Sequence, residues 1–283
     1  MLPRSFLYVP GDRPDLFDKA AGGAADAVVL DLEDAVPLAG KAAARDAVRR
    51  WLDTDNADIA GSAEVWVRVD PLGVAADLDA VVHPRLDGLF VAGCTPAVLA
   101  QVADGVAQLE RERGLTPGAV RLVGLVESAA GMLALAEMAA HPRLTAFGIG
   151  EVDLLGDLRM ARSSRTEAAV LHLRTQVVVH SAAAGLEAPV APTSTDFRDL
   201  DAFAESTRLA LDLGFRSRTA IHPGQVPVIH DVLTPSAEEA EAARDVVRRF
   251  AAADGGVTTD AAGRLIDAAV VRGARETLAR AGS

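Results

Sequence analysis

Residues 121–153, RLVGLVESAAGMLALAEMAAHPRLTAFGIGEVD, alternate between two kinds of segment. Short apolar runs at 121–126 and 145–149 flank an alanine-rich run with helical periodicity at 129–140. Two strands joined by a helix form a βαβ unit, whose strands are parallel. An acidic side chain follows each run, Glu127 after the first and Asp153 after the second. The segment therefore predicts a parallel sheet with carboxylates beyond the carboxyl ends of its strands.

The same alternation recurs over most of the chain and predicts the whole architecture. The expected strands are 5–9, 27–32, 64–69, 88–92, 121–126, 145–149, 188–192 and 218–222. The expected helices between them are 14–24, 39–52, 74–83, 95–112, 129–140, 163–185 and 198–213. Eight parallel strands that alternate with helices are typical of a (β/α)8 TIM barrel. We therefore expect an α/β protein of this class.

The residues after the eighth strand predict a C-terminal helical extension. Pro235-Ser236 is a helix-start signal for a helix over 236–252, the segment 252–263 is rich in Gly, Thr and Asp, and a last helix is expected over 268–281. We expect a catalytic barrel over residues 1–235 and an extension over 236–283 that reaches a neighbouring subunit.

Composition excludes several classes of function. The chain has 283 residues, 50% of them hydrophobic, and its 40 acidic and 28 basic side chains give a net charge of −12. Such a charge repels phosphates and anionic lipids, so we expect neither a nucleic acid nor a membrane as partner. The single cysteine, Cys94, excludes a disulfide framework and a cysteine-based zinc site. No apolar run approaches the roughly 18 residues that span a bilayer, so we expect a cytoplasmic protein.

Glu127 and Asp153 are the candidate metal ligands. They follow neighbouring strands of the predicted barrel, where active sites of such barrels lie. Carboxylate oxygens without cysteine or paired histidines suit Mg²⁺. The residue types leave another interpretation open, in which Glu127 caps the helix that begins near Ser128 and Asp153 is an exposed loop acid.

A second charged group is expected at the ends of the second and third strands. Asp31, Glu33 and Asp34 are three acids within four residues, and Arg68 lies among valines in EVWVRV. A guanidinium in an apolar barrel needs an anion, because its burial is otherwise costly. A substrate carboxylate and a buried salt bridge to Asp31 or Glu33 are equally compatible with the sequence.

Other candidate residues flank these strands. Gly150 allows the backbone to approach a ligand closely, and we expect it to contact the substrate together with Glu151. Arg13 and Lys41 are basic residues suited to phosphates, although isolated basic residues are usually only solvated.

Seven ordered motifs together resemble one known family. They are RSFLYVPGDRP at 4–14, DAVVLDLEDAV at 26–36, VRVDPLG at 67–73, GLVESAAG at 124–131, FGIGEVDLLGDL at 147–158, AIHPGQVPVI at 220–229 and GRLID at 263–267. This set resembles the citrate lyase beta subunit branch of the HpcH/HpaI aldolase family, which also contains malyl-CoA and citramalyl-CoA lyases. The resemblance covers nearly the whole chain.

The resemblance implies a magnesium-dependent barrel that cleaves a carbon–carbon bond. It implies that Glu127 and Asp153 hold Mg²⁺ and that Arg68 binds the oxo acid as a catalytic residue. Glu33 is a further catalytic candidate. Asp267 matches an acidic residue that related enzymes supply from an adjacent subunit as the acid/base.

The resemblance also implies the substrate and the partners. Arg13 and Lys41 become candidates for the end of the substrate that carries CoA or an acyl-carrier thioester. We expect cleavage of a citryl-type 3-hydroxyacyl thioester to oxaloacetate and an acetyl thioester. The alternatives are a stand-alone malyl-CoA or citramalyl-CoA lyase, which releases glyoxylate or pyruvate, and a catalytically weakened oxo-acid-binding protein. A homotrimer or hexamer is expected, and citrate lyase alpha and gamma subunits are candidate partners.

Three departures from the family pattern bear on the substrate. Relatives usually have Asn where this chain has Asp70, Lys in the segment where Arg218 stands, and a Pro-Lys pair where the fourth strand reads VAGC at 91–94. Each departure changes local charge, so substrate identity is less firmly implied than fold or metal.

Overall fold

The computed structural model describes residues 1–54 and 63–282, and within them the chain forms a closed parallel barrel followed by a smaller helical unit. The barrel strands are β1 (Ser5–Pro10), β2 (Ala27–Asp31), β3 (Glu64–Val69), β4 (Gly88–Val91), β5 (Arg121–Val126), β6 (Leu144–Ile149), β7 (Val190–Ala191) and β8 (Ser217–Ala220). Each strand pairs in parallel with the next, and β8 pairs with β1 to close the barrel. The predicted TIM-barrel fold is confirmed.

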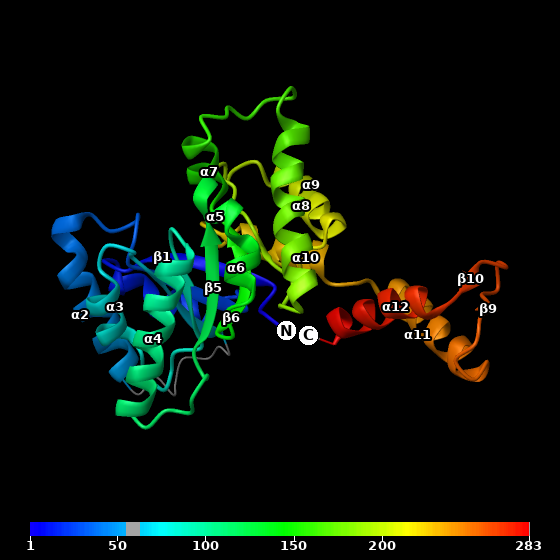
Figure 1. The fold of residues 1–283 in the computed structure, drawn as a ribbon, viewed down its shortest axis with the longest axis horizontal. Helices are drawn as coiled ribbons and strands as arrows, with labels where there is room; N and C mark the ends of the chain where they lie inside the picture. Colours follow the sequence, from blue (N-terminus) through cyan, green and yellow to red (C-terminus); the bar gives the residue numbers. More distant parts are fainter. Residues whose placement is uncertain (55–62, 283) are drawn as a thin grey trace. The chain divides into compact units, whose positions relative to one another are not determined.

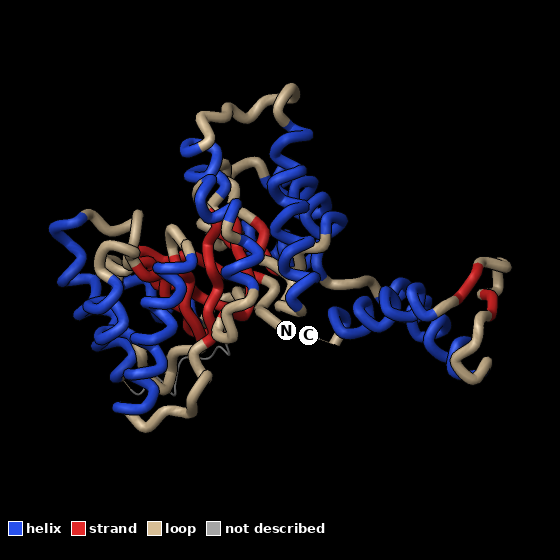
Figure 2. Tube along the Cα trace, in the orientation of Figure 1, coloured by secondary structure: helices blue, strands red, loops and turns tan. Residues whose placement is uncertain are grey.

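Helices follow the strands and surround them (Figures 1 and 2). In the barrel these are α1 (Phe17–Ala21), α2 (Lys41–Asp53), α3 (Val74–Val81), α4 (Pro96–Glu112), α5 (Ala129–Leu133), α6 (Leu135–Ala139), α7 (Glu151–Asp157), α8 (Glu167–Ala184), α9 (Leu200–Leu213) and α10 (Gln225–Leu233). Two short 3-10 turns, Pro14–Leu16 and Leu38–Gly40, precede α1 and α2.

Two apolar cores hold the barrel together. The outer core packs the helices against the outward side chains of the strands, and α2 contributes Ala44, Val48 and Leu52 to it. The inner core fills the barrel, where Phe6 packs edge-on against Trp66 and Phe90 at ring-centroid distances of 5.2 and 5.1 Å. The interior is therefore packed, and the open space lies beyond the strand ends, as barrels of this kind require.

Several expected helices differ from those observed. The helix expected at 129–140 is divided into α5 and α6 at Ala134, and the one expected at 14–24 is a 3-10 turn followed by the five residues of α1. The helix expected at 163–185 begins at Glu167, and α9 begins at Leu200, two residues later than expected. The seventh strand is limited to two residues, because Pro189 and Pro192 flank it and lack the N–H that a strand uses.

Two helices were missed by the sequence interpretation. The residues of α7 follow directly after Gly150 and were interpreted only as a polar strand end. The residues of α10 include Pro227, which lies in the first turn, where a missing N–H costs nothing. Both helices are short and lie close to strand ends, where apolar periodicity is weakest.

The chain divides between Ile229 and His230, inside α10, into two compact units. The second unit contains α11 (Ala237–Ala252), a hairpin of β9 (Thr258–Thr259) and β10 (Leu265–Ile266), and α12 (Ala268–Ala281). Ser236 and Glu239 form a capping box at the start of α11, which confirms the helix-start signal. The hairpin replaces part of the loop expected over 252–263.

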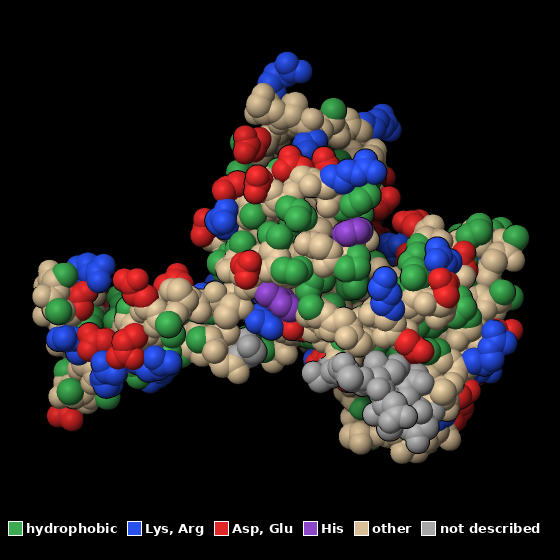
Figure 3. All heavy atoms as spheres, turned by 180° about the vertical axis from the view of Figure 1, so that it is seen from behind, with side chains coloured by type: hydrophobic (Ala, Val, Ile, Leu, Met, Phe, Trp, Pro, Cys, Tyr) green, Lys and Arg blue, Asp and Glu red, His purple; other side chains and the backbone are tan. Residues whose placement is uncertain are grey.

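The surface of the molecule is polar and mixed in sign. The face drawn in Figure 3 shows acidic and basic side chains interspersed with apolar ones. Among the described residues, no helix has the length and hydropathy needed to cross a membrane.

Candidate active site

A cavity of about 480 Å³ opens beyond the carboxyl ends of the barrel strands. Seven charged side chains line it: Asp31, Asp34, Arg68, Glu127, Glu151, Asp153 and Arg162. Strand ends and the segments after them supply these residues: Glu151 and Asp153 lie in the first turn of α7, and Arg162 lies between α7 and α8. This end of a parallel barrel is where polar groups are exposed. Carboxylates therefore outnumber guanidinium groups in the lining.

Arg68, on β3, is held by the carboxylates that follow β2. Its Nε and Nη2 donate to Asp31 at 2.7 and 2.6 Å, and its Nη1 lies 2.8 Å from Glu33 and 3.7 Å from Asp34. The guanidinium also lies 5.0 Å from the centroid of the Tyr8 ring. The buried salt bridge that the sequence left open is thus present, and Arg68 still lines the cavity. The two interpretations of Arg68 are compatible.

Glu127 follows β5 and points toward the same cavity. Its carboxylate accepts the N–H of Gly93, and Gly150 passes so close that a Cβ there would lie 2.4 Å from the Glu127 side chain. The helix cap is supplied by Ser128, which accepts the Gly131 N–H, so the helix-cap interpretation of Glu127 is wrong. Burial raises the pKa of Glu127 to about 7, and the nearby negative charge of Asp153 acts in the same direction.

The sequence left open that Asp153 is an exposed loop acid. Asp153 is exposed, but it lies in the first turn of α7 and not in a loop. Neither Asp153 nor Glu127 forms an ion pair with any residue that the structure describes. Over residues 1–54 and 63–282, no cluster of three or more His, Cys, Asp or Glu forms a complete metal cage. A pair of carboxylates without a cationic partner fits Mg²⁺, which commonly takes one or two protein carboxylates and fills its other positions with water or substrate oxygens.

Glu151 has a different environment from its neighbour Asp153. It is 5% exposed, and its carboxylate accepts two hydrogen bonds from Arg174, at 2.6 and 2.9 Å, and one from Arg162. Gly150 and Glu151 both line the cavity, and their contact with the substrate stays a prediction. The sequence suggested that the backbone at Gly150 approaches a ligand closely. In the structure this backbone lies close to the Glu127 side chain.

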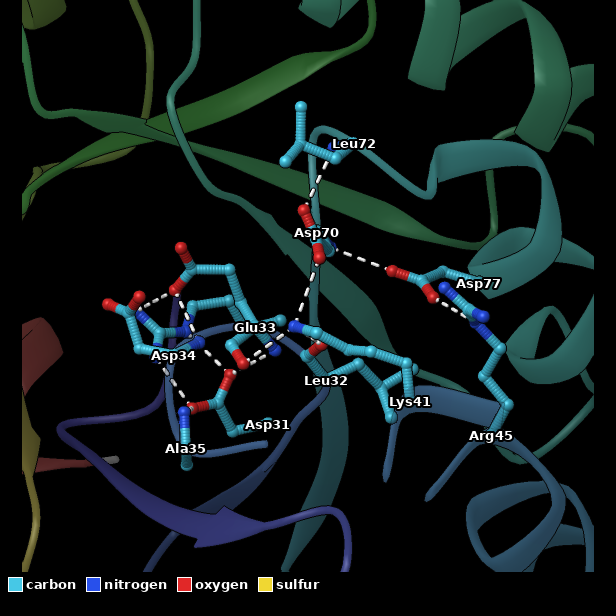
Figure 4. Close-up of polar contacts among 11 residues, drawn as sticks. Asp31, Leu32, Glu33, Asp34, Ala35, Lys41, Arg45, Asp70, Leu72 and Asp77 are labelled. Carbon is cyan, nitrogen blue, oxygen red and sulfur yellow. Dashed lines mark hydrogen bonds and ion pairs between the residues drawn. The ribbon is translucent and has the colours of Figure 1, made fainter. Parts of the chain in front are cut away.

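Lys41 is buried behind the site (Figure 4). Its ammonium group donates to the carbonyl oxygens of Leu32 and Glu33, both at 2.7 Å, and lies 3.0 Å from the Asp70 carboxylate. Asp70 in turn accepts the N–H of Leu72 at 2.8 Å. Lys41 is not among the residues that line the cavity. The structure thus places the expected thioester-binding lysine inside the protein, fastened to the loop after β2.

Two further candidates, Arg13 and Asp267, are not among the residues that line the cavity. Arg13 is exposed beyond β1 and forms an ion pair with Asp15 at 2.8 Å. Asp267 belongs to the second unit, where its carboxylate caps α12 by accepting the N–H groups of Ala269 and Val270 at 2.9 Å. Their expected roles remain predictions.

Tyr8 and Arg162 are among the lining residues that the sequence interpretation missed. Tyr8 shares a strand face with Phe6, so the period of two along β1 contained a usable signal. Arg162 lies in the segment between α7 and α8, where no periodicity exists.

Comparison with known proteins places this site in a family. The family model described as HpcH/HpaI aldolase/citrate lyase matches residues 4–223, which include the whole barrel. The chain belongs to the HpcH/HpaI aldolase/citrate lyase family. The predicted family membership is confirmed.

Individual relatives span nearly the full chain. A (3S)-malyl-CoA thioesterase of Cereibacter sphaeroides is 33% identical over 98% of this chain and 94% of its own length. The citrate lyase subunit beta of Leuconostoc mesenteroides is 28% identical over 98% and 92%. The crystal structure of CitE from Mycobacterium tuberculosis, in complex with magnesium, acetoacetate and coenzyme A, matches with a TM-score of 0.79 and 28% identity, covering 99% of this chain and 98% of that one.

Proposed function

We propose that this protein is a magnesium-dependent carbon–carbon lyase that cleaves a citryl-type 3-hydroxyacyl thioester to oxaloacetate and an acetyl thioester. One observation carries the proposal. Glu127 and Asp153 are two carboxylates without an ion-pair partner among the described residues, and they line the same cavity as Arg68. Relatives of the same family carry citrate lyase and malyl-CoA lyase names, and a CitE relative was crystallised with oxaloacetate and magnesium. Malyl-CoA or citramalyl-CoA cleavage is the second candidate.

The reaction places a defined demand on each residue. The substrate hydroxyl loses its proton, and the carbon that carries it becomes a carbonyl as the C–C bond breaks. The bonding electrons pass to the acetyl thioester, which leaves as an enolate. The enolate then takes up a proton at carbon. Glu127 and Asp153 would hold Mg²⁺, which supplies Lewis-acid polarisation of the oxygen that becomes the keto group. Arg68 contributes a fixed positive charge next to the oxo-acid carboxylate, and Asp31 and Glu33 hold its orientation.

The acid/base is assigned to Asp267 of a second copy of the chain, and Arg13 to the nucleotide or carrier end of the thioester. Glu33 is assigned a catalytic role through its contact with Arg68. The protein is proposed to act in the cytoplasm as a homotrimer or hexamer, with oxaloacetate and CoA or an acyl-carrier thioester as ligands. Citrate lyase alpha and gamma subunits are candidate partners.

Calorimetric titration of oxaloacetate, glyoxylate and pyruvate, with and without Mg²⁺, tests the site. We expect magnesium-dependent binding of oxaloacetate in the wild type and loss of at least tenfold in affinity in Glu127→Ala. The matched control is Glu137→Ala, because Glu137 is exposed on α6 and does not line the cavity.

A cleavage assay then distinguishes the proposed substrate from the second candidate. Release of oxaloacetate from citryl-CoA supports the proposal, and release of glyoxylate or pyruvate from malyl-CoA or citramalyl-CoA supports the second candidate. Hydrolysis of the thioester without C–C cleavage, or oxo-acid binding without turnover of any of these thioesters, contradicts a lyase. If none of the three oxo acids binds in a magnesium-dependent way, the proposed metal and oxo-acid site is contradicted.

A further inference from the structure

The barrel contains a second cavity, of about 390 Å³, between α8, α9 and the segment that precedes α8. Helices α8 and α9 pack side by side, and Figure 1 shows them next to each other. The polar residues that line this cavity are Arg162, Ser163, Ser164, Glu167, Arg174 and Ser206. The chemistry proposed above uses none of the serines and neither helix.

Arg174 lines this cavity and retains donors that no described residue uses. The residue is 8% exposed, and its Nε and Nη2 donate to Glu151. Its Nη1 has no hydrogen-bond partner among the described residues. A guanidinium carries five N–H donors, so the side of Arg174 that faces away from Glu151 retains donors for a further acceptor. Arg162 shares the same carboxylate and also lines the cavity.

Arg218 is a buried cation without a carboxylate. It is 4% exposed, donates to the carbonyl oxygens of Pro192 and Phe203 and to the hydroxyls of Ser206 and Thr207, and stacks 3.9 Å from the Phe203 ring centroid. No Asp or Glu of the described chain pairs with it. Burial, together with the positive charge of Arg174, lowers the pKa of Arg218 to about 9. Its neighbour Ser206 lines the cavity.

The charges around this cavity do not balance. Two guanidinium groups line it, the buried Arg174 and the exposed Arg162, and both pair with the buried carboxylate of Glu151. Glu167 adds an exposed carboxylate to the lining, and Arg218 lies outside the lining, in contact with Ser206. Buried charges in proteins are normally paired, because an unpaired one loses hydration without compensation. Arg162 and Glu167 are both exposed and screened by solvent, so the buried excess near this cavity is one positive charge, that of Arg218.

We propose that this cavity is a binding site for a phosphate group, carried by inorganic phosphate or by a small phosphate ester. Arginine forks and serine hydroxyls are the donors that phosphate oxygens take in proteins. The 18-residue helix α8 also begins at this cavity with Glu167, so its first N–H groups and the positive end of its dipole lie on the same side. The volume exceeds that of a single phosphate ion and accommodates a small organic group attached to it.

The site is tested by titrating inorganic phosphate and glycerol 3-phosphate into the full chain, with chloride at matched ionic strength as reference. We expect saturable binding of one equivalent and a higher melting temperature in phosphate than in chloride, since a ligand that binds only the folded state stabilises it. Tighter binding of glycerol 3-phosphate assigns the site to an ester, and equal or weaker binding assigns it to the free ion.

Two variants and one control locate the binding. Leu209→Glu places a carboxylate in the cavity lining, and Arg218→Met removes the unpaired charge. Each is expected to lower phosphate affinity at least tenfold. Arg208→Gln is the control, because Arg208 is exposed on α9 and pairs with Glu205. Absence of binding to the wild type, or unchanged affinity in Leu209→Glu, overturns the proposal, and the second result holds even if Arg218→Met fails to fold.

Discussion

The ammonium group of Lys41 has three N–H donors, and three oxygens of two loops surround it. Two are backbone carbonyls of the loop that carries Glu33, and the third belongs to Asp70 after β3. Burial alone would raise the pKa of Asp70, but the Leu72 N–H and Lys41 hold it below its ordinary value. Asp70 therefore acts as the counter-charge of Lys41, and this lysine positions the loop that orients Arg68.

Lys41→Met should destabilise the protein by about 3 kcal/mol, because it leaves the Asp70 carboxylate and two carbonyl groups without their donor. Urea unfolding measures this loss. Lys19→Met serves as control, since Lys19 is exposed on α1 and should change stability by less than about 0.5 kcal/mol. If Lys41→Met were as stable as the wild type and instead bound the thioester more weakly, the lysine would be a ligand-binding group.

Glu33 predicts how stability depends on pH. Burial raises its pKa to about 7 from an ordinary 4.5, against the opposing effect of Arg68. The folded protein thus binds the proton on Glu33 more tightly than the unfolded chain does. The protonated carboxyl therefore contributes stability that is complete below pH 4.5 and is lost as pH rises through 7. The free energy of unfolding should fall over this range in chelator-treated protein. Glu33→Gln should flatten the fall in part, because Glu127 contributes in the same sense, and an unchanged slope would contradict the assignment.

At the scale of elements, the sequence predicted the strands and helices that recur in the alternating strand–helix pattern. The eight strands follow from apolar runs of regular spacing, and Glu127 and Asp153 became candidates because they come within four residues of the ends of two such runs. The strand-end rule places a residue near the site without showing where its side chain points. The family resemblance, and not this rule, implied that Lys41 binds the thioester end. Its side chain is held inside by two backbone carbonyls, a contact that no pattern of residue types encodes.

Helix α7 offers a matched pair of glycine substitutions, Gly150 at its N-cap and Gly156 near its end. In Gly150→Ala the new Cβ would lie 2.4 Å from the Glu127 carboxylate, so that side chain must move. We expect at least a tenfold loss of magnesium-dependent oxo-acid affinity, measured by calorimetry. In Gly156→Ala the Cβ meets nothing within 4 Å, and the helix should gain about 0.5–1 kcal/mol without a change in affinity. Equal affinities in the two variants would show that Glu127 is not a ligand.

The whole molecule consists of a barrel that carries most of the proposed machinery and a smaller unit that carries Asp267. The barrel cavity, as lined, contains Arg68 and the carboxylate pair but no group assigned to transfer the proton. The division of the chain near Ile229 thus coincides with a division of proposed roles. If the proposed roles hold, the site is completed by Asp267 of another copy, and turnover then requires assembly.

Mixing two inactive variants tests this shared site. Asp267→Asn keeps a side-chain oxygen to cap α12 but loses the acid/base, and Glu127→Ala loses the metal ligand while keeping Asp267. Each should lose at least a hundredfold in cleavage rate while remaining assembled, as size-exclusion chromatography measures. After the two are mixed and allowed to exchange subunits, some sites combine an intact barrel with an intact Asp267, so part of the wild-type activity should return. If activity never returns although subunits exchange, each chain completes its own site, because only a site drawn from two copies is restored by the mixture.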